Sequence, residues 1–212
     1  MTHILILGAT GQIGSELLKL ALADPRVERV TAPTRRPLAP QPRLLNPIID
    51  FDDLPETADW WRADIAFCAL GTTLRQAGSR NAFYRVDHDA VCDAARRLSA
   101  AGTPTLGLVS SLGADPASRI FYLRVKGETE RDLVTLAFPS LVLIRPSLLI
   151  GGPRAEGRPL EAAGLFLGKW LSGLLPRRYH AVRTQAVAEA LYGACTDPAQ
   201  GVHIIDSASI PA

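Results

Sequence analysis

Short, almost wholly apolar segments alternate along this chain with longer segments of helical periodicity, and this alternation limits the fold more than any other feature. The apolar segments span residues 4–7, 27–34, 47–51, 64–70, 105–110, 141–145 and 202–205. The segments that space apolar side chains three and four positions apart span residues 12–23, 81–101, 118–137 and 182–195. Strands that are apolar on both faces and separated by helices form parallel sheets covered on both sides. The sequence therefore predicts an α/β fold with a doubly wound parallel sheet.

The length of 212 residues, the 47% hydrophobic content and the mean hydropathy of +0.11 are typical of one globular domain with a sizeable core. We therefore expect residues 1–212 to form a single domain. Four prolines between residues 37 and 47 predict a loop there. Residues 151–178 are expected to be an irregular apolar insertion on the substrate side. Within it, Gly164–Leu175 is apolar almost all round, which is compatible with a lid over a pocket, a surface between two copies in a homodimer, a helix lying on a membrane or plain core.

Charge and cysteine content exclude several classes of protein. The net charge is +2 and no run of Lys or Arg exceeds two residues, so we expect no nucleic-acid partner. The three cysteines are far apart and form no CxxC motif, which predicts neither a disulfide framework nor a metal site. No apolar run is long enough to span a membrane. The chain enters an apolar run directly after Met1-Thr2-His3, without a basic leader, and we expect a cytoplasmic protein.

A glycine-rich turn stands between the first apolar run and the first helical segment. Its sequence is Gly8-Ala9-Thr10-Gly11-Gln12-Ile13-Gly14. Glycines allow a sharp turn and bring backbone N–H groups at a helix N-terminus close to a pyrophosphate. This strand–turn–helix context predicts dinucleotide binding by Gly8, Thr10, Gly11, Gln12, Ile13 and Gly14.

The residues that follow the second predicted strand indicate which dinucleotide is bound. An NAD site carries an acidic residue about 20 positions after the glycines, to hold the ribose 2′-hydroxyl. This chain has Arg35-Arg36 there instead, and two guanidinium groups suit a 2′-phosphate. The alternative is a solvated basic loop before Pro37. We predict NADP(H) as the cofactor.

A tyrosine and a lysine four positions apart, Tyr122 and Lys126, lie within a predicted helix. At this spacing both side chains are on one helix face. A phenol with its ordinary pKa of about 10 is a poor acid at neutral pH, and a nearby cation lowers that value. Lysine is rare here, with 3 of the 23 basic residues, which makes its position informative. Ser111, with Ser110 beside it, ends the preceding strand 11 residues before Tyr122. The alternative is an ordinary amphipathic helix with a surface pair.

These motifs, with CALGTT, AFYRVDHDAV, LVSSLGAD, FYLRVKGETE and LIRPSLLI in that order, resemble the atypical short-chain dehydrogenase/reductases. The subgroup resembled is the one that includes the HIV Tat-interactive protein oxidoreductase. The likeness runs from Gly8 to about Ala194. It implies a Rossmann-like fold and hydride transfer between NADPH and a small carbonyl substrate.

The same resemblance implies roles for individual residues. Ser111 would orient the carbonyl, Tyr122 would donate the proton, and Lys126 would lower the pKa of the phenol and hold the nicotinamide ribose. Other reductases carry an asparagine for a proton relay where this chain has Asp87, which places the relay in question. The implied cofactor-binding residues outside the glycine turn are Arg35, Arg36, Asp50, Phe51, Leu70, Gly71, Thr72, Tyr122, Lys126, Pro146 and Leu149.

Two alternatives stay open at this stage. A relative that binds NADPH without turnover, as a regulatory or sensor protein, would carry the same motifs. Phe51 is compatible with a place in the core as well as beside the adenine. His88 and His180 show no partner pattern in the sequence, so structural or solvated roles are expected for them.

Overall fold

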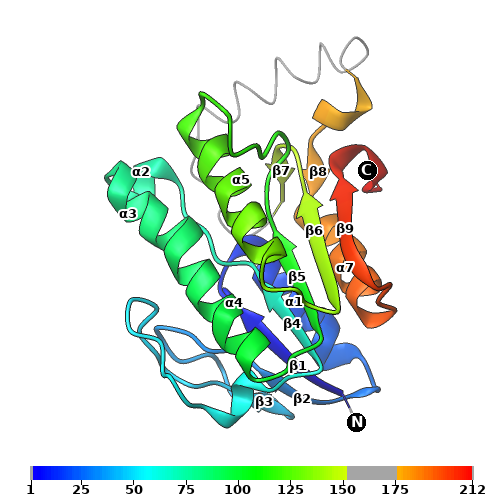
Figure 1. The fold of residues 1–212 in the computed structure, drawn as a ribbon. Coiled ribbons are helices and arrows are strands. Elements are labelled where there is room, and N and C mark those ends of the chain that lie inside the picture. Colours follow the sequence, from blue (N-terminus) through cyan, green and yellow to red (C-terminus); the bar gives the residue numbers. More distant parts are fainter. Residues whose placement is uncertain (1, 152–175, 212) are drawn as a thin grey trace.

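The computed structural model describes residues 2–151 and 176–211, and a seven-stranded parallel sheet forms its centre (Figure 1). In sheet order the strands are β3 (Leu44–Leu45), β2 (Val27–Thr31), β1 (Thr2–Leu7), β4 (Ile65–Cys68), β5 (Thr105–Val109), β6 (Ser140–Arg145) and β9 (Gly201–Asp206). The chain winds outward from β1 in both directions, so the strand order reverses between β1 and β4. Ligands of open α/β sheets bind at such a reversal, outside the carboxyl ends of the strands. The doubly wound fold predicted from the sequence is confirmed.

Helices cover both faces of the sheet. α1 (Gln12–Ala23) and α7 (Thr184–Thr196) pack together on one face, and α4 (Ala90–Ala100) and α5 (Phe121–Val134) lie on the other (Figure 1). The shorter elements are the helices α2 (Leu74–Ala77) and α3 (Arg80–Tyr84), the π-helical turn η2 (Arg85–Asp89), the 3₁₀ turns η1 (Asp59–Trp61), η3 (Arg177–Tyr179) and η4 (Ser207–Ser209), and the strand pair β7 (Leu149–Ile150) and β8 (Val182–Arg183).

Strand β1 shows how the sequence fills both layers of the core. Successive side chains of a strand point to opposite faces of the sheet. Ile4 and Ile6 accordingly join the cluster that contains α1 and α7, whereas Leu5 and Leu7 join the cluster with α4 and α5. All four side chains are fully buried. In a strand buried on both faces, the side chains of both faces contact the core. Polar and apolar residues therefore do not alternate, which explains the run ILIL.

The turn after β1 requires glycine at two positions. Gly8 has a φ of 83°, and a Cβ on it would lie 2.5 Å from the carbonyl oxygen of Ala69. A Cβ on Gly14 would lie 2.1 Å from the carbonyl oxygen of Gly8. Both distances are far shorter than a van der Waals contact, so helix α1 begins directly against the end of β1 only because neither residue has a side chain.

The segment around β3 differs from its prediction. The expected strand over residues 47–51 is reduced to one bridge between Thr34 and Ile48, and the regular pairing with β2 lies earlier, at β3. Arg43 causes this shift. It adopts a φ of 66°, its carbonyl oxygen accepts from Val30 N–H at 2.8 Å, and its guanidinium bonds to the carbonyl oxygens of Val27 and Leu22. The proline-rich stretch expected to be a loop therefore contains a short strand.

Two helix predictions also need correction. The helix expected over residues 81–101 is interrupted by η2, where the N–H of Ala90 donates to the carbonyl oxygen of Arg85, five positions back. The helix expected from Val182 begins at Thr184, because Val182 pairs with Leu149 in β8. The segment Gly164–Leu175 and most of the expected insertion over residues 151–178 lie outside the described residues. Within the described ranges, no helix has the length and apolar character needed to cross a membrane.

Candidate functional site

A cavity of about 490 Å³ opens at the carboxyl ends of the central strands. It lies between the glycine turn, the turn after β4, the end of β5, the helix α5 and the turn after β6. From the predicted site it is lined by Gly11, Gln12, Ile13, Leu70, Gly71, Thr72, Ser111, Tyr122, Lys126, Pro146 and Leu149. The structure therefore brings together two motifs that lie more than a hundred residues apart in the sequence.

The glycine turn presents the start of α1 to this cavity. Gly11 stands at the N-cap in an extended conformation and donates its N–H to the carbonyl oxygen of Gly8 at 2.9 Å. Within residues 2–151 and 176–211 no side chain caps α1, and its first turn contains no acidic residue. Backbone N–H groups at a helix start carry a partial positive charge. This end of the helix is therefore suited to an anion such as a phosphate.

A buried ion pair occupies the other side of the cavity. Asp87 Oδ1 lies 2.7 Å from Lys126 Nζ, and the exposed fractions of the two side chains are 1% and 8%. The second carboxylate oxygen accepts the N–H of Thr72 at 2.8 Å. The Thr129 hydroxyl lies 2.9 Å from the carbonyl oxygen of Asp87. These contacts connect the turn after β4, the π-helical turn and α5, so the lysine is held in one position.

The charge on Lys126 depends on this pairing. Burial acts to lower its pKa, but the carboxylate of Asp87 and the neighbouring Tyr122 outweigh burial and raise the pKa above its ordinary value. The lysine therefore stays protonated at neutral pH. A side chain at Gly71 would enter this site, because its Cβ would lie 3.3 Å from Asp87 Oδ1 and 3.7 Å from Lys126 Nζ.

Tyr122 is half-buried and lines the cavity one helical turn before Lys126. Its ring packs against Phe83 of α3 with ring centroids 5.7 Å apart. Phe83 also contacts Phe121, with centroids 5.8 Å apart. Tilted contacts of this kind restrict the orientation of an aromatic ring and leave its hydroxyl group free of these contacts. The phenol can thus serve as a positioned donor at the cavity wall.

The two serines at the end of β5 differ in their surroundings. Ser110 is buried, and among the described residues its hydroxyl has no hydrogen-bond partner. Ser111 is half-buried, and its hydroxyl donates to the carbonyl oxygen of Leu112 over a long 3.4 Å. Both line the cavity. Either hydroxyl is available to a ligand there.

Several predicted residues lie outside the lining of the cavity. Gly8, Thr10 and Gly14 shape the turn beneath it. Arg35 and Arg36 follow β2 and are exposed. The remaining two are Asp50, which is also exposed, and Phe51, which packs against the core cluster of α4 and α5. Phe51 thus has the core contact that the sequence left as an alternative.

Sequence reasoning named other residues of this site incompletely or not at all. It noted Asp87 only as a departure from an expected asparagine, not as the partner of Lys126. It missed Gln76 on α2, which lines the cavity, and of the stretch after β6 it singled out Pro146 and Leu149 but not Ser147, which also lines the cavity. The hydroxyl of Ser147 donates to the carbonyl oxygen of His180. Gln76 lies in none of the motifs, so no signal in the sequence identifies it, whereas Ser147 lies inside the motif LIRPSLLI.

Comparison with known proteins places this chain in a family. No protein-family model matches the chain. The protein HTATIP2 of Rattus norvegicus is 36% identical over 206 residues, which cover 93% of this chain and 83% of the relative. The mitochondrial protein fmp52 of Aspergillus fumigatus is 37% identical over 191 residues, or 82% of this chain and 79% of the relative. The chain belongs to the HTATIP2/FMP52 family of atypical short-chain dehydrogenase/reductases.

Solved structures support the same fold for this family member. MoeE5 in complex with UDP-glucose and NAD superposes with a TM-score of 0.73 at 19% identity, covering 95% of this chain and 74% of MoeE5. WbmH of Bordetella bronchiseptica in complex with NAD⁺ gives a TM-score of 0.70 at 16% identity, covering 98% of this chain and 76% of WbmH. At such identities the likeness establishes the Rossmann-like fold.

The expected cytoplasmic location is contradicted by the relatives. The fungal members of the family from Aspergillus fumigatus, Emericella nidulans and Debaryomyces hansenii are named mitochondrial proteins. That expectation rested on the absence of a recognisable leader before the first strand, and such an absence does not determine location.

Proposed function

We propose that this chain is an NADP(H)-dependent oxidoreductase that transfers hydride between the nicotinamide and a small carbonyl substrate. One observation carries the proposal. A single cavity joins the uncapped start of α1 to Ser111, Tyr122 and Lys126, with the lysine fixed by Asp87. Membership of a short-chain dehydrogenase/reductase family and the NAD-bound fold neighbours support the same reading.

The residues around the cavity fit a dinucleotide. The start of α1 has no side-chain cap and no acidic group in its first turn, so its N–H groups suit the pyrophosphate. Gly71 leaves open the space that a side chain would take from the ion pair, which suits a ribose near Lys126. Arg35 and Arg36, exposed after β2, are proposed to hold the 2′-phosphate by charge-assisted hydrogen bonds. Asp50, Leu70, Thr72, Pro146 and Leu149 complete the proposed cofactor contacts.

The bound cofactor supplies or accepts the hydride, and the chain's own residues handle the proton. Tyr122 donates the proton to the carbonyl oxygen during reduction. Lys126 places a positive charge beside the phenol and stabilises the negative charge that the tyrosine acquires. Ser111 orients the carbonyl oxygen by a hydrogen bond. Asp87 acts through Lys126, because it keeps the buried ammonium protonated and in place.

The decisive experiment compares Tyr122→Phe with the native protein. NADPH oxidation is followed against a panel of small aldehydes and ketones, and substrates found with the native protein are used for the variant. We expect turnover to fall about 100-fold or more, which is the scale of general acid catalysis, while NADPH affinity changes little. Unchanged turnover by Tyr122→Phe would refute the assigned chemistry. Ser110→Ala and Ser111→Ala, measured in parallel, identify the serine that binds substrate.

A second experiment tests the choice of cofactor. Replacing Arg35 and Arg36 together with alanine should weaken NADPH binding at least about tenfold and leave NADH binding nearly unchanged, because only NADPH carries the 2′-phosphate. Arg62→Ala is the matched control, since Arg62 is exposed just before the amino end of β4, away from the cavity. Equal losses for both cofactors in a titration by calorimetry would contradict the role of these arginines.

A cofactor-binding protein without turnover is the second candidate. The feature that favours it is the close pairing of Lys126 with Asp87. An ammonium whose charge is balanced by a carboxylate stabilises a tyrosinate less strongly than an unpaired ammonium does. This candidate predicts tight NADPH binding with no oxidation of NADPH by any carbonyl in the panel.

A further inference from the structure

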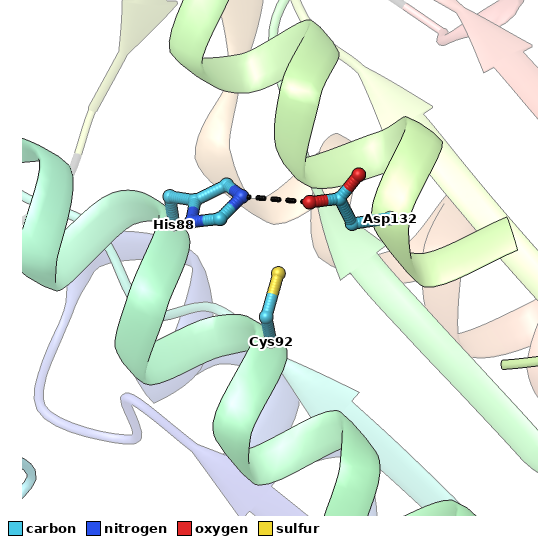
Figure 2. Close-up of side chains that lie close together, drawn as sticks. All are labelled: His88, Cys92 and Asp132. Atoms are coloured by element: carbon cyan, nitrogen blue, oxygen red, sulfur yellow. Dashed lines mark hydrogen bonds and ion pairs between the residues drawn. The ribbon is translucent and has the colours of Figure 1, made fainter. Parts of the chain in front are cut away.

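Three side chains with metal-binding atoms meet on the far side of the ion pair, between two helices. Figure 2 shows His88 of the π-helical turn, Cys92 of α4 and Asp132 of α5 pointing toward one another. His88 Nε2 lies 3.0 Å from Asp132 Oδ2, and the nearest imidazole, thiol and carboxylate atoms all lie within 4.8 Å of one another. His88 and Cys92 are four residues apart, so they occupy one helix face.

The imidazole of His88 also has a carboxylate on its other nitrogen. Nδ1 lies 2.8 Å from Asp89 Oδ1. Metal-binding histidines usually present one ring nitrogen to the metal while the other donates to a carboxylate, which fixes the tautomer and the ring orientation. Asp89 is placed for that role, which leaves Nε2 directed toward Asp132.

The cluster is shielded from solvent. His88 is 8% exposed and Cys92 is 1% exposed. A nitrogen, a sulfur and an oxygen atom that can bind a metal therefore meet at one protected position between the helices.

We propose that His88 Nε2, Cys92 Sγ and Asp132 Oδ2 form a zinc site. Zinc takes nitrogen, thiolate and carboxylate ligands together, and a tetrahedral site with three protein ligands leaves one position for water. Ligand bonds of about 2.0–2.3 Å place the ligand atoms of a tetrahedral site roughly 3.3–3.8 Å apart, so small side-chain movements suffice. Binding displaces the proton of His88 and the thiol proton of Cys92, and both are released to solvent.

An access route to this site exists. A second cavity, of about 370 Å³, is lined by His88, Asp89 and Cys92, together with Phe51 and Arg85. It provides a path for the ion and room for a water as fourth ligand. The two helices that the ion would join also carry Asp87 and Lys126, but this proposal does not depend on the proposed function. The alternative is a hydrogen-bonded network that only holds η2 and α5 together.

The test uses the full-length protein, stripped with a chelator and kept reduced. Titration with Zn²⁺ against a chromophoric chelator should give one bound equivalent, and Mg²⁺ should not compete. Titration with Co²⁺ should give a thiolate-to-cobalt charge-transfer band in the near ultraviolet. Cys92→Ala should abolish that band and weaken Zn²⁺ binding about 100-fold or more, and Asp89→Asn, which removes the carboxylate behind His88, should weaken binding about 10-fold.

The controls separate a site from a network. Cys195→Ala removes another buried cysteine, on α7 at the opposite face of the sheet, and should leave the cobalt band and the Zn²⁺ affinity unchanged. Asp132→Asn, whose side chain is 30% exposed, is a second ligand variant with little risk to folding and should also lose the affinity. No charge-transfer band in the native protein, or a band and affinity unchanged by both ligand variants, would overturn the proposal.

Discussion

The ion pair between Asp87 and Lys126 leads to a prediction about the free energy of unfolding, and it concerns the same residues that line the candidate site. Asp87→Asn keeps the size of the side chain and an oxygen for the N–H of Thr72, and removes only the charge. At 2.7 Å and an effective dielectric constant of about 20, the lost attraction amounts to about 6 kcal/mol. Part of that is offset in the variant, because the buried lysine can lose its proton. Removing one partner of a buried pair costs about 3–5 kcal/mol in comparable cases, and we expect about 3 kcal/mol here.

The assay is urea unfolding at pH 7, followed by far-ultraviolet circular dichroism. For a protein of this length, a loss of about 3 kcal/mol corresponds to a fall in Tm of about 6–12 °C. The effect also has a pH signature. The folded state raises the pKa of Lys126, so the stabilisation is fully present below the unfolded pKa of about 10.4 and is lost as the pH rises through the folded value. The difference between native protein and Asp87→Asn should therefore shrink as the solution becomes strongly alkaline.

A double-mutant cycle distinguishes the loss of the ion pair from a nonspecific loss of stability. Lys126→Met removes the buried charge and keeps much of the aliphatic volume. The double variant Asp87→Asn/Lys126→Met should be more stable than Asp87→Asn alone, with a coupling energy of about 2–3 kcal/mol. If Asp87→Asn loses less than about 1 kcal/mol, or if the two single effects simply add, then the ion pair does not hold this part of the structure as argued.

Two further predictions concern stability away from the ion pair. Gly14→Ala should cost more than about 3 kcal/mol or prevent folding, since its Cβ would lie 2.1 Å from a backbone oxygen, whereas Gly193→Ala on α7, with open space around it, should stabilise by up to about 1 kcal/mol in thermal unfolding. Similar Tm values for the two variants would contradict this. Asp24 accepts hydrogen bonds from Arg26 and Tyr192, and Arg26 holds the pKa of this carboxyl far below its usual range. The resulting stabilisation is present above about pH 4 and is lost as the pH falls through the folded pKa. Tyr192→Phe removes one of the hydrogen bonds to this carboxylate and should cost about 1 kcal/mol at pH 7 in thermal unfolding. An unchanged Tm for Tyr192→Phe would contradict this contribution.

The sequence was sufficient for the fold class because its signals are local and repeated. Each buried strand is a short apolar run, and the glycine turn directly joins the first run to the first helix. The same locality explains the error at residues 47–51. Pairing with β2 was decided by the positive φ of Arg43 and by its hydrogen bonds to carbonyl groups of other segments, and none of these contacts has a pattern in the sequence.

The site was predictable to the extent that it consists of motifs. Tyr122 and Lys126 share a helix, and their spacing indicates a shared face. The partner of Lys126 comes from another helix, and the π-helical turn that carries Asp87 cannot be recognised from a 3.6-residue periodicity. The cluster of His88, Cys92 and Asp132 was missed for the same reason. The spacing of His88 and Cys92 was visible, but its significance depends on a carboxylate from α5.

The π-helical turn gives the two cavities a common structural origin. Asp87 and His88 are adjacent in sequence, yet Asp87 lines the cavity beside the glycine turn and His88 lines the second cavity. Adjacent residues of a helical turn point in different directions, so one turn can serve two sites at once. Helix α5 does the same with Lys126 and Asp132, which contact Asp87 and His88 respectively. The same two elements therefore hold both contacts.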